Sequence, residues 1–194
     1  MMPFNRSDAP NILKANYKRL GRQWEKRKKA NIKAQFTWGK GVYVVILPQL
    51  LIDSHNHCGF CDLRPLRQMG ATVEHFKPKS LHPFLAYVWH NLFPCCSNCQ
   101  KKGEFFSRLL LKPDVVGFEF NDYFVYNYST GELEPNPSVS TQNQDRAEET
   151  RKLYRLNDFE RPEERKQVLE LYLKLQQAGS LIDKNDFSFR FMLP

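Results

Sequence analysis

The first clearly periodic segment of the chain covers residues 11–35. Its apolar side chains are separated by four, three and four positions, a spacing that predicts an α-helix with one apolar stripe. The stripe consists of Leu13, Tyr17, Leu20 and Trp24. Basic side chains fall largely off this stripe, so we expect them to face solvent.

A second apolar segment, residues 38–56, contains Pro48. Proline fits the first turn of a helix but interrupts a helix interior, so the pattern allows two interpretations. Either a helix begins at Pro48 and runs to about residue 55, or Pro48 interrupts a longer helix.

The last third of the chain combines a predicted hairpin with two predicted helices. Aromatic and polar side chains alternate over residues 118–134, and residues 129–131 supply the turn. A polar loop over residues 135–144 follows, and helical patterns cover residues 145–156 and 162–178. Together with the N-terminal helix, these elements predict an α+β fold.

The chain of 194 residues carries a formal net charge of +8, and the position of this charge is more informative than its size. Residues 14–33 contain nine basic side chains and one acidic side chain, so this strip accounts for the whole net charge. A local basic strip is typical of contact with a polyanion such as nucleic acid, although a solvated helix face would have the same composition. The candidate contacts are Arg19, Arg22, Lys26 and Lys29.

No apolar run reaches the ~20 residues that a membrane span needs. The longest run, residues 42–52, is too short and contains Pro48. The first residues of the chain lack the apolar segment of a signal peptide. We therefore expect a soluble, cytoplasmic protein that has no membrane partner.

Five cysteines in a chain without a secretory signal argue against a disulfide framework. Four of them form two Cys-x-x-Cys pairs separated by 34 residues, namely Cys58 with Cys61 and Cys96 with Cys99. Each pair can present two thiolates to one tetrahedral ion, so together they predict a closed, structural Zn²⁺ site. The alternative is a redox-active pair, which predicts a disulfide and no zinc. Cys95 would break the two-residue spacing, so it stays outside the predicted site.

The residues between the two cysteine pairs include the side chains that phosphodiester hydrolysis requires. His75 can take a proton from water, and its neighbour Glu74, on the opposite side of a strand, can hold a hard cation. Asn91 can bond to the second ring nitrogen of His75 and fix its tautomer. Considered alone, His75 would be read as a satisfied, half-buried histidine. The letters of residues 55–57 also spell H-N-H, but we expect His55 and His57 to lie on the surface.

The combined pattern over residues 58–106 resembles the HNH nuclease family, whose fold is a β-hairpin and helix around one catalytic cation (ββα-metal). The pattern comprises the two cysteine pairs, residues 73–79 (Val-Glu-His-Phe-Lys-Pro-Lys), residues 89–92 (Trp-His-Asn-Leu) and the Lys-Gly at 102–103. It is most similar to the PtuB-like nuclease subunit of Septu and retron-associated anti-phage defence systems. A weaker resemblance continues into residues 147–150, residues 156–157 and Arg165.

The resemblance implies a zinc-stapled ββα-metal core and endonuclease activity, with His75, Glu74 and Asn91 at the catalytic centre. It implies Mg²⁺ or Mn²⁺ as the catalytic cation, held by Glu74 and a second ligand. Where the family has Asn or His as that ligand, this chain has Gln100. The resemblance also implies a PtuA-like ATPase subunit as partner. The candidate phosphate contacts around the implied site are Lys77, Lys79 and Lys102.

We expect three segments along the chain. Residues 1–40 are a basic helical segment, residues 41–110 the nuclease core with its zinc site, and residues 111–194 a hairpin and helices packed on the core. The main alternative function is a non-catalytic zinc module that docks nucleic acid or the ATPase. Gln100 favours this alternative, whereas the intact Glu74, His75 and Asn91 oppose it. No base-reading motif is visible, so DNA and RNA both remain open as substrates.

Overall fold

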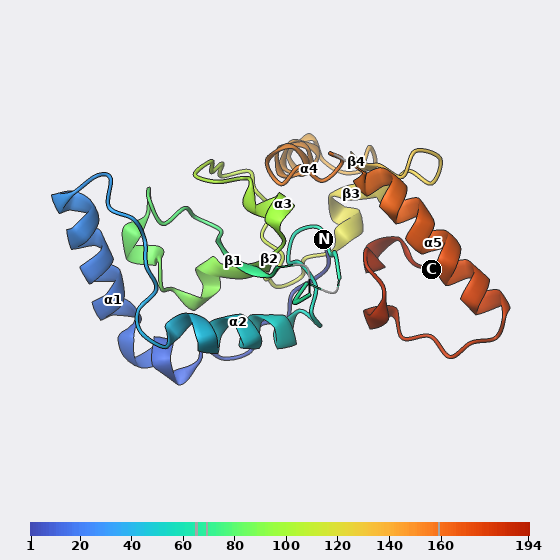
Figure 1. The fold of residues 1–194 in the computed structure, drawn as a ribbon. Helices are drawn as coiled ribbons and strands as arrows, with labels where there is room; N and C mark the ends of the chain where they lie inside the picture. Colours follow the sequence, from blue (N-terminus) through green and yellow to red (C-terminus); the bar gives the residue numbers. More distant parts are fainter. Residues whose placement is uncertain (65, 69, 159) are drawn as a thin grey trace.

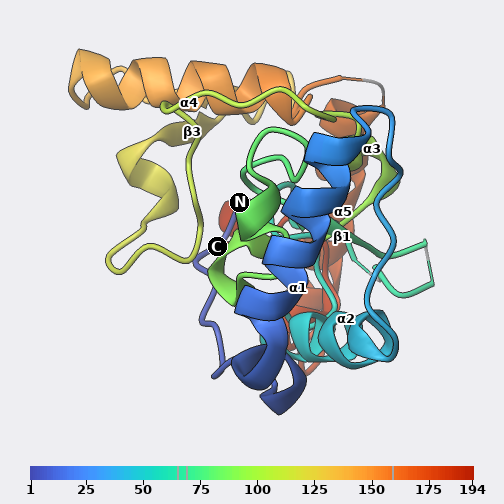
Figure 2. The same ribbon diagram turned by 90° about the vertical axis from the view of Figure 1, so that its left-hand side faces the viewer.

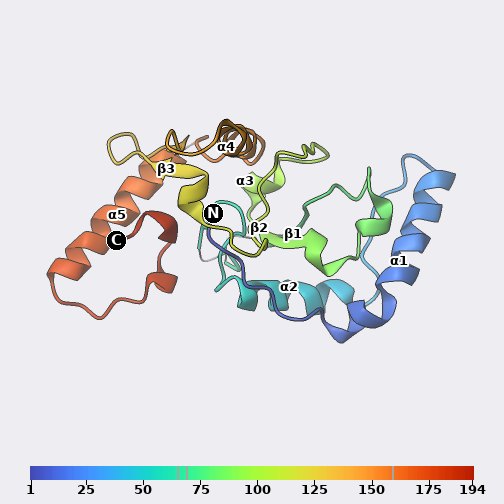
Figure 3. The ribbon, with the colours of Figure 1, turned by 180° about the vertical axis from the view of Figure 1, so that it is seen from behind.

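The computed structural model of the protein describes residues 1–64, 66–68, 70–158 and 160–194. In these residues the fold is α+β, with five α-helices and two small antiparallel sheets of two strands each. Figure 1 shows the sheet of β1 and β2 near the middle of the molecule, with α1 at one end and α5 at the other. The same arrangement is seen from behind in Figure 3.

The predicted N-terminal helix is α1, Asn11–Ala30. Its apolar stripe is buried or half-buried as expected, but the helix ends five residues earlier than the predicted boundary at residue 35. The chain becomes extended at Asn31, and the guanidinium of Arg27 then donates to the carbonyl of Gln35 at 3.1 Å and to the hydroxyl of Thr37 at 3.2 Å. These two bonds hold the next segment alongside the last turn of α1.

The second apolar segment forms α2, Val42–Asp53, which contains Pro48 in its interior. Neither predicted interpretation is correct, because the helix neither begins nor breaks at Pro48. Proline removes a donor to the carbonyl of Val44, and that residue lies on the exposed face of α2. The opposite face packs against β2. In the part of the chain that the structure describes, no helix combines the length and the apolar character needed to cross a membrane.

The central sheet pairs β1, Thr72–His75, with β2, Leu92–Cys95. The strands are antiparallel, and His75 lies opposite Leu92 while Thr72 lies opposite Cys95. The connection between them contains two short 3₁₀ turns, Pro83–Leu85 and Trp89–Asn91. A single helical turn, α3 (Ser97–Gln100), follows β2 almost at once. The end of β1 therefore lies beside the start of β2, and the second cysteine pair lies at the far end of the sheet.

The C-terminal part confirms the predicted hairpin and both predicted helices. The hairpin consists of β3, Phe124–Tyr126, and β4, Leu133–Pro135. The helices are α4, Thr141–Leu153, and α5, Arg161–Gln177. Helix α4 begins four residues before the predicted boundary because the hydroxyl of Ser140 accepts a hydrogen bond from the backbone of Asn143 at 3.3 Å and caps the helix.

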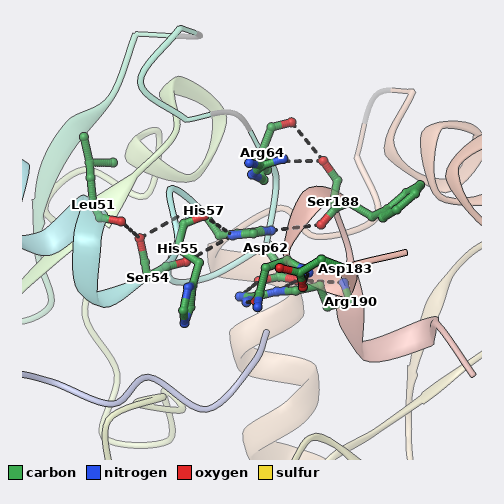
Figure 4. A network of polar contacts seen from close by, with 11 residues as sticks. Leu51, Ser54, His55, His57, Asp62, Arg64, Asp183, Ser188 and Arg190 are labelled. Atoms are coloured by element: carbon green, nitrogen blue, oxygen red, sulfur yellow. Dashed lines mark hydrogen bonds and ion pairs between the residues drawn. The ribbon is translucent and has the colours of Figure 1, made fainter. Parts of the chain in front are cut away.

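The C-terminal tail packs against the loop that carries the first cysteine pair (Figure 4). The carboxylate of Asp62 accepts hydrogen bonds from the Arg190 backbone at 2.7 Å and from its guanidinium at 2.7 and 3.1 Å. The hydroxyl of Ser188 bonds to the backbone of Arg64 in both directions, at 2.9 and 3.0 Å. Residues more than 120 positions apart in the sequence are thus joined by hydrogen bonds, and those between Asp62 and Arg190 are charge-assisted.

His57 belongs to the same contact, and the prediction that it lies on the surface is wrong. Its side chain is buried, and both ring nitrogens lie near backbone carbonyl oxygens, including Nε2 at 2.9 Å from Phe187. His55 is exposed, as predicted. His57 is therefore a structural residue that lies between this loop and the C-terminal tail.

Gly131, in the turn between β3 and β4, allows the hairpin to approach α5 closely. Its φ is 78°, and a Cβ added there would lie 2.1 Å from the carbonyl oxygen of Pro162. Gly179 has a similar φ of 70° but open space around it. The two glycines therefore share a backbone conformation and differ in their packing.

We expect Gly131→Ala to destabilise the protein more than Gly179→Ala does. The control substitution introduces only the left-handed backbone strain, about 1–2 kcal/mol. Gly131→Ala adds displacement of the α5 backbone, a further cost of about 1–3 kcal/mol typical of overpacking. Urea unfolding of both variants measures the difference. Equal reductions in stability would show that the hairpin does not pack this closely.

Candidate metal centre and candidate active site

Four cysteine sulfurs meet at the end of the central sheet. Cys58 and Cys61 come from the loop after α2, Cys96 follows β2, and Cys99 lies in α3. The four residues are buried, and their Sγ atoms all lie within 4.8 Å of one another. The first pair reaches β2 because the backbone N–H of Gly59 donates to the carbonyl of Pro94 at 2.9 Å.

This arrangement matches the donor set and spacing of a structural zinc site. Tetrahedral Zn²⁺ with Zn–S bonds of ~2.3 Å places its sulfurs roughly 3.8 Å apart, and the Sγ atoms of Cys61 and Cys96 are separated by 3.7 Å. All five cysteines are free thiols in this structure. Cys95 lies outside the group, as predicted, and its Sγ donates to a backbone carbonyl at 3.4 Å.

The imidazole of His75 is held in one orientation at the end of β1. Its Nε2 lies 3.0 Å from the carbonyl oxygen of Ala86, so Nε2 carries the proton and Nδ1 keeps a lone pair. Trp38 stacks on the ring at 5.3 Å between centroids, and Phe36 contacts it edge-on at 5.4 Å. Nδ1 is buried and has no hydrogen-bond partner among the described residues. The geometry leaves one basic nitrogen unused.

Burial decides the protonation state of this ring. Removal from water, with the nearby positive charge of Lys79 acting in the same direction, lowers the pKa of His75 to about 3. The hydrogen bond to Ala86 opposes this shift only in part. The ring is therefore neutral at physiological pH, and Nδ1 carries no proton.

Asn91 does not take the role that the sequence predicted for it. Its side-chain oxygen accepts from the Lys77 backbone at 2.8 Å, and its amide nitrogen donates to the carbonyls of Lys77 at 3.0 Å and Leu85 at 3.2 Å. Ala86 supplies the contact to His75 instead. Asn91 acts on the ring only indirectly. Its side chain joins the backbone at Lys77 to the backbone at Leu85, which is the neighbour of Ala86. Side-chain amides can bond to backbone donors and acceptors at once, and sequence spacing does not show which partner they choose.

Glu74 lies in a buried polar cluster. One carboxylate oxygen is 2.7 Å from the ammonium of Lys102, and the other accepts from the amide of Gln100 at 2.6 Å. The amide oxygen of Gln100 in turn accepts from the hydroxyl of Thr72 at 2.7 Å. Burial raises the pKa of Glu74 to about 7, although Lys102 opposes the shift. A cation beside this carboxyl would favour its ionised form.

Glu74, His75 and Gln100 line one cavity of about 430 Å³. We predicted that Glu74 and His75 would face opposite sides of the strand, yet both border the same space. Among the described residues, β1 pairs only with β2. The acidic, imidazole and amide groups of Glu74, His75 and Gln100 border one cavity although the first two are neighbours on one strand.

The N-terminal helix supplies another wall of this cavity. Lys28 and Lys33, from the end of the basic strip, line the cavity together with Lys79. Helix α1 is anchored here because the indole of Trp24 donates to the Lys79 carbonyl at 2.8 Å. Figure 2 shows α1 crossing one side of the molecule in front of the central strands. The candidate contacts on the helix, Arg19, Arg22, Lys26 and Lys29, are exposed.

The three lysines predicted to meet phosphate have different surroundings. Lys77 is exposed and lies over the ring of Phe106, and Lys79 borders the cavity. The prediction that Lys102 contacts phosphate is wrong, because its side chain is buried and its ammonium is paired with Glu74. A buried carboxylate needs a compensating charge, and the Lys-Gly motif supplies it here.

Glu74 and Gln100 have the chemistry that a hard cation requires. A carboxylate and an amide stand side by side and border the same cavity, and oxygen donors of this kind suit Mg²⁺ or Mn²⁺. In this structure the amide nitrogen of Gln100 faces Glu74. A half-turn of the amide would present its oxygen in that place. These two side chains would hold the cation.

Sequence reasoning missed three contributors to these sites. Trp38 and the Ala86 carbonyl fix the His75 ring, and Arg161 donates to two of the clustered sulfurs. Trp38 and Arg161 lie more than 35 residues from the groups they contact, and backbone carbonyls have no sequence signature. None of the three could be found from motif spacing.

Comparison with known proteins adds no identification. No protein-family model matches the chain, and no curated protein matches it with significant similarity.

We expect the purified protein to contain about one zinc ion per chain, measured by elemental analysis. Cys58→Ser or Cys96→Ser should lose both zinc and the cooperative thermal unfolding transition, because closed zinc sites contribute directly to folding stability. Cys95→Ala is the matched control, since Cys95 is equally buried but lies outside the cluster. Full zinc occupancy in a Cys58→Ser/Cys96→Ser double variant would contradict the four-cysteine site.

Proposed function

We propose that this protein is a metal-dependent endonuclease of the HNH type, with β1, β2 and α3 as its ββα-metal core. The observation that carries the proposal is the free Nδ1 of His75, held in a fixed neutral ring beside Glu74 and Gln100 in one cavity. A neutral imidazole whose other nitrogen is bound to a backbone carbonyl has the arrangement of a general base.

In this proposal His75 accepts the proton of the attacking water at Nδ1. Its Nε2–H stays bound to Ala86, and Trp38 keeps the ring from turning away. A bound Mg²⁺ or Mn²⁺ would polarise the phosphate and stabilise the leaving oxygen. Lys79, Lys28 and Lys33 line the cavity and would attract the phosphate backbone. The zinc centre holds the strands in place and takes no part in the chemistry.

The biological setting in the proposal rests on the resemblance of residues 58–106 to the PtuB-like subfamily. In that setting the protein is the effector nuclease of a bacterial anti-phage complex with a PtuA-like ATPase subunit. The weaker C-terminal resemblance falls on structural residues: Thr150 accepts from the Leu111 backbone at 2.9 Å, and Arg165 donates to the Gly131 carbonyl at 2.9 Å. These positions support the fold that carries the site.

A second candidate function is a zinc module that binds nucleic acid or the ATPase without cutting. The ion pair between Glu74 and Lys102 favours it, because the carboxylate already has a cationic partner. The Nδ1 of His75, which has no hydrogen-bond partner among the described residues, favours the nuclease, because a buried polar atom without a partner is unusual in a purely structural residue. The two functions differ in the effect of removing His75.

We expect His75→Ala to lower nucleic-acid cleavage by about 10²–10⁴-fold, the usual loss when a positioned base is removed. Binding affinity, zinc content and melting temperature should stay close to those of the unmodified protein, because a general base acts mainly in the transition state. Cleavage of plasmid DNA and of tRNA in Mg²⁺, Mn²⁺ or EDTA measures the effect.

His55→Asn is the matched control, because His55 belongs to the literal His-Asn-His run but is exposed. Asparagine also tolerates the positive φ of 53° at this position. Unchanged cleavage by His75→Ala would refute the proposed mechanism. Glu74 is a poorer target for this test, since its removal would leave the buried Lys102 without its counter-charge and would destabilise the fold.

The exposed face of α1 gives a separate prediction. Replacing Arg19, Arg22, Lys26 and Lys29 by Gln should weaken nucleic-acid binding and reduce the slope of log Kd against log salt. The slope should fall by roughly one unit for each phosphate that the variant no longer neutralises. Fluorescence anisotropy at several salt concentrations measures it.

Lys152, Lys166 and Lys174 are suitable control positions because they are partly or largely exposed on α4 and α5, whose described residues do not line the cavity. Their replacement by Gln should leave the slope nearly unchanged. An unaltered slope in the α1 variant would show that the basic strip does not contact phosphates and is a solvated face or a protein-binding surface.

A further inference from the structure

The buried four-cysteine cluster raises a question of charge. Four thiolates around one Zn²⁺ carry a formal charge of about −2, and burying a net charge is costly unless another group compensates it. The guanidinium of Arg161 is in direct contact with the cluster. Its Nη2 lies 3.5 Å from the Sγ of Cys96 and 3.4 Å from the Sγ of Cys99. The Arg161 residue is 3% exposed, so this contact is shielded from water.

The same guanidinium also joins two helices. Its Nη1 donates to the carbonyls of Tyr154 at 3.3 Å and Arg155 at 3.1 Å, at the C-terminal end of α4. Arg161 is itself the first residue of α5. One planar group therefore contacts two sulfurs on one side and two backbone oxygens on the other. Only arginine offers enough donors in a rigid plane for such a set, because lysine has a single point charge.

We propose that Arg161 is a positioning residue of the zinc centre, which compensates the charge of the tetrathiolate site and fixes α5 to the second cysteine pair. The inference rests on the zinc site and does not depend on the proposed nuclease activity. In it, zinc binding and docking of the C-terminal helices are coupled. Removing the guanidinium should weaken zinc retention, and removing zinc should loosen the contact of α5 with α3.

Arg165 provides a matched control on the next turn of α5. It is also buried, but its partners are oxygens: it donates to the carbonyls of Gly131 and Leu156 and to the side chain of Asn157. Arg165→Lys should therefore disturb the packing of α5 without touching the sulfurs. A comparison of the two positions separates an effect on zinc from a general loosening of the helix.

The experiment uses the intact, zinc-loaded chain with Arg161→Lys, Arg161→Gln or Arg165→Lys. Zinc affinity is measured by competition with a chromogenic chelator, and Co²⁺-substituted protein reports sulfur-to-metal charge transfer by absorbance. We expect Arg161→Gln to weaken zinc binding by about 10–100-fold, the usual cost of losing a residue that supports metal ligands. The zinc affinity of Arg161→Lys should lie between that of Arg161→Gln and that of the unmodified protein, because lysine keeps the positive charge but lacks the planar set of donors.

The charge-transfer band should shift in both Arg161 variants and stay in place in Arg165→Lys, even where the melting temperatures of all three are lowered. The proposal is overturned if the Arg161 variants retain both the affinity and the band of the unmodified protein. It is also overturned if Arg165→Lys changes them to the same extent, because the effect would then come from helix packing. Should Arg161→Gln fail to fold, the comparison between the two lysine variants decides the question.

Discussion

The convergence of four cysteine side chains is the constraint on which the rest of this structure depends. The central strands have four residues each, and an isolated pair of such short strands is at best marginally stable in water. The cysteine cluster joins the loop after α2 to β2 and α3, so it supplies long-range order that the sheet lacks. The C-terminal tail and α5 attach to the same region through Arg190 and Arg161. The C-terminal part of the molecule thus depends on this cluster.

The candidate active site is shaped by burial rather than by exposed charge. Removal from water lowers the pKa of His75 and raises that of Glu74, so both groups are driven toward their neutral forms. The consequences differ, because Lys102 and Gln100 partner the carboxylate while the Nδ1 of His75 is left free. The Nδ1 of His75, a ring nitrogen without a hydrogen-bond partner among the described residues, makes this cavity a candidate for catalysis. In the proposed function, the lysines that line the cavity would attract the ligand and take no part in the chemical step.

Several features were predictable from the sequence because they depend on local periodicity or on spacing within a few residues. The stripe of α1 and the hairpin of β3 and β4 follow directly from side-chain period. The four-cysteine group follows from two tight turns, each of which orients its own pair. Boundaries were less accurate: α1 ended early at an extended Asn31, where Arg27 bonds to the Gln35 carbonyl and the Thr37 hydroxyl, and α2 ran through Pro48.

The sequence by itself determined which residue types were available: four thiol ligands, the Glu74-His75 pair and a concentrated basic strip. The tertiary structure decided their partners. Asn91 bonds to the backbone and not to the His75 ring, Lys102 pairs with Glu74, and His57 is buried against the C-terminal tail. The physical reason is that a buried polar group must find a partner wherever the folded chain supplies one. Those partners come from segments distant in sequence, whose proximity no local pattern encodes.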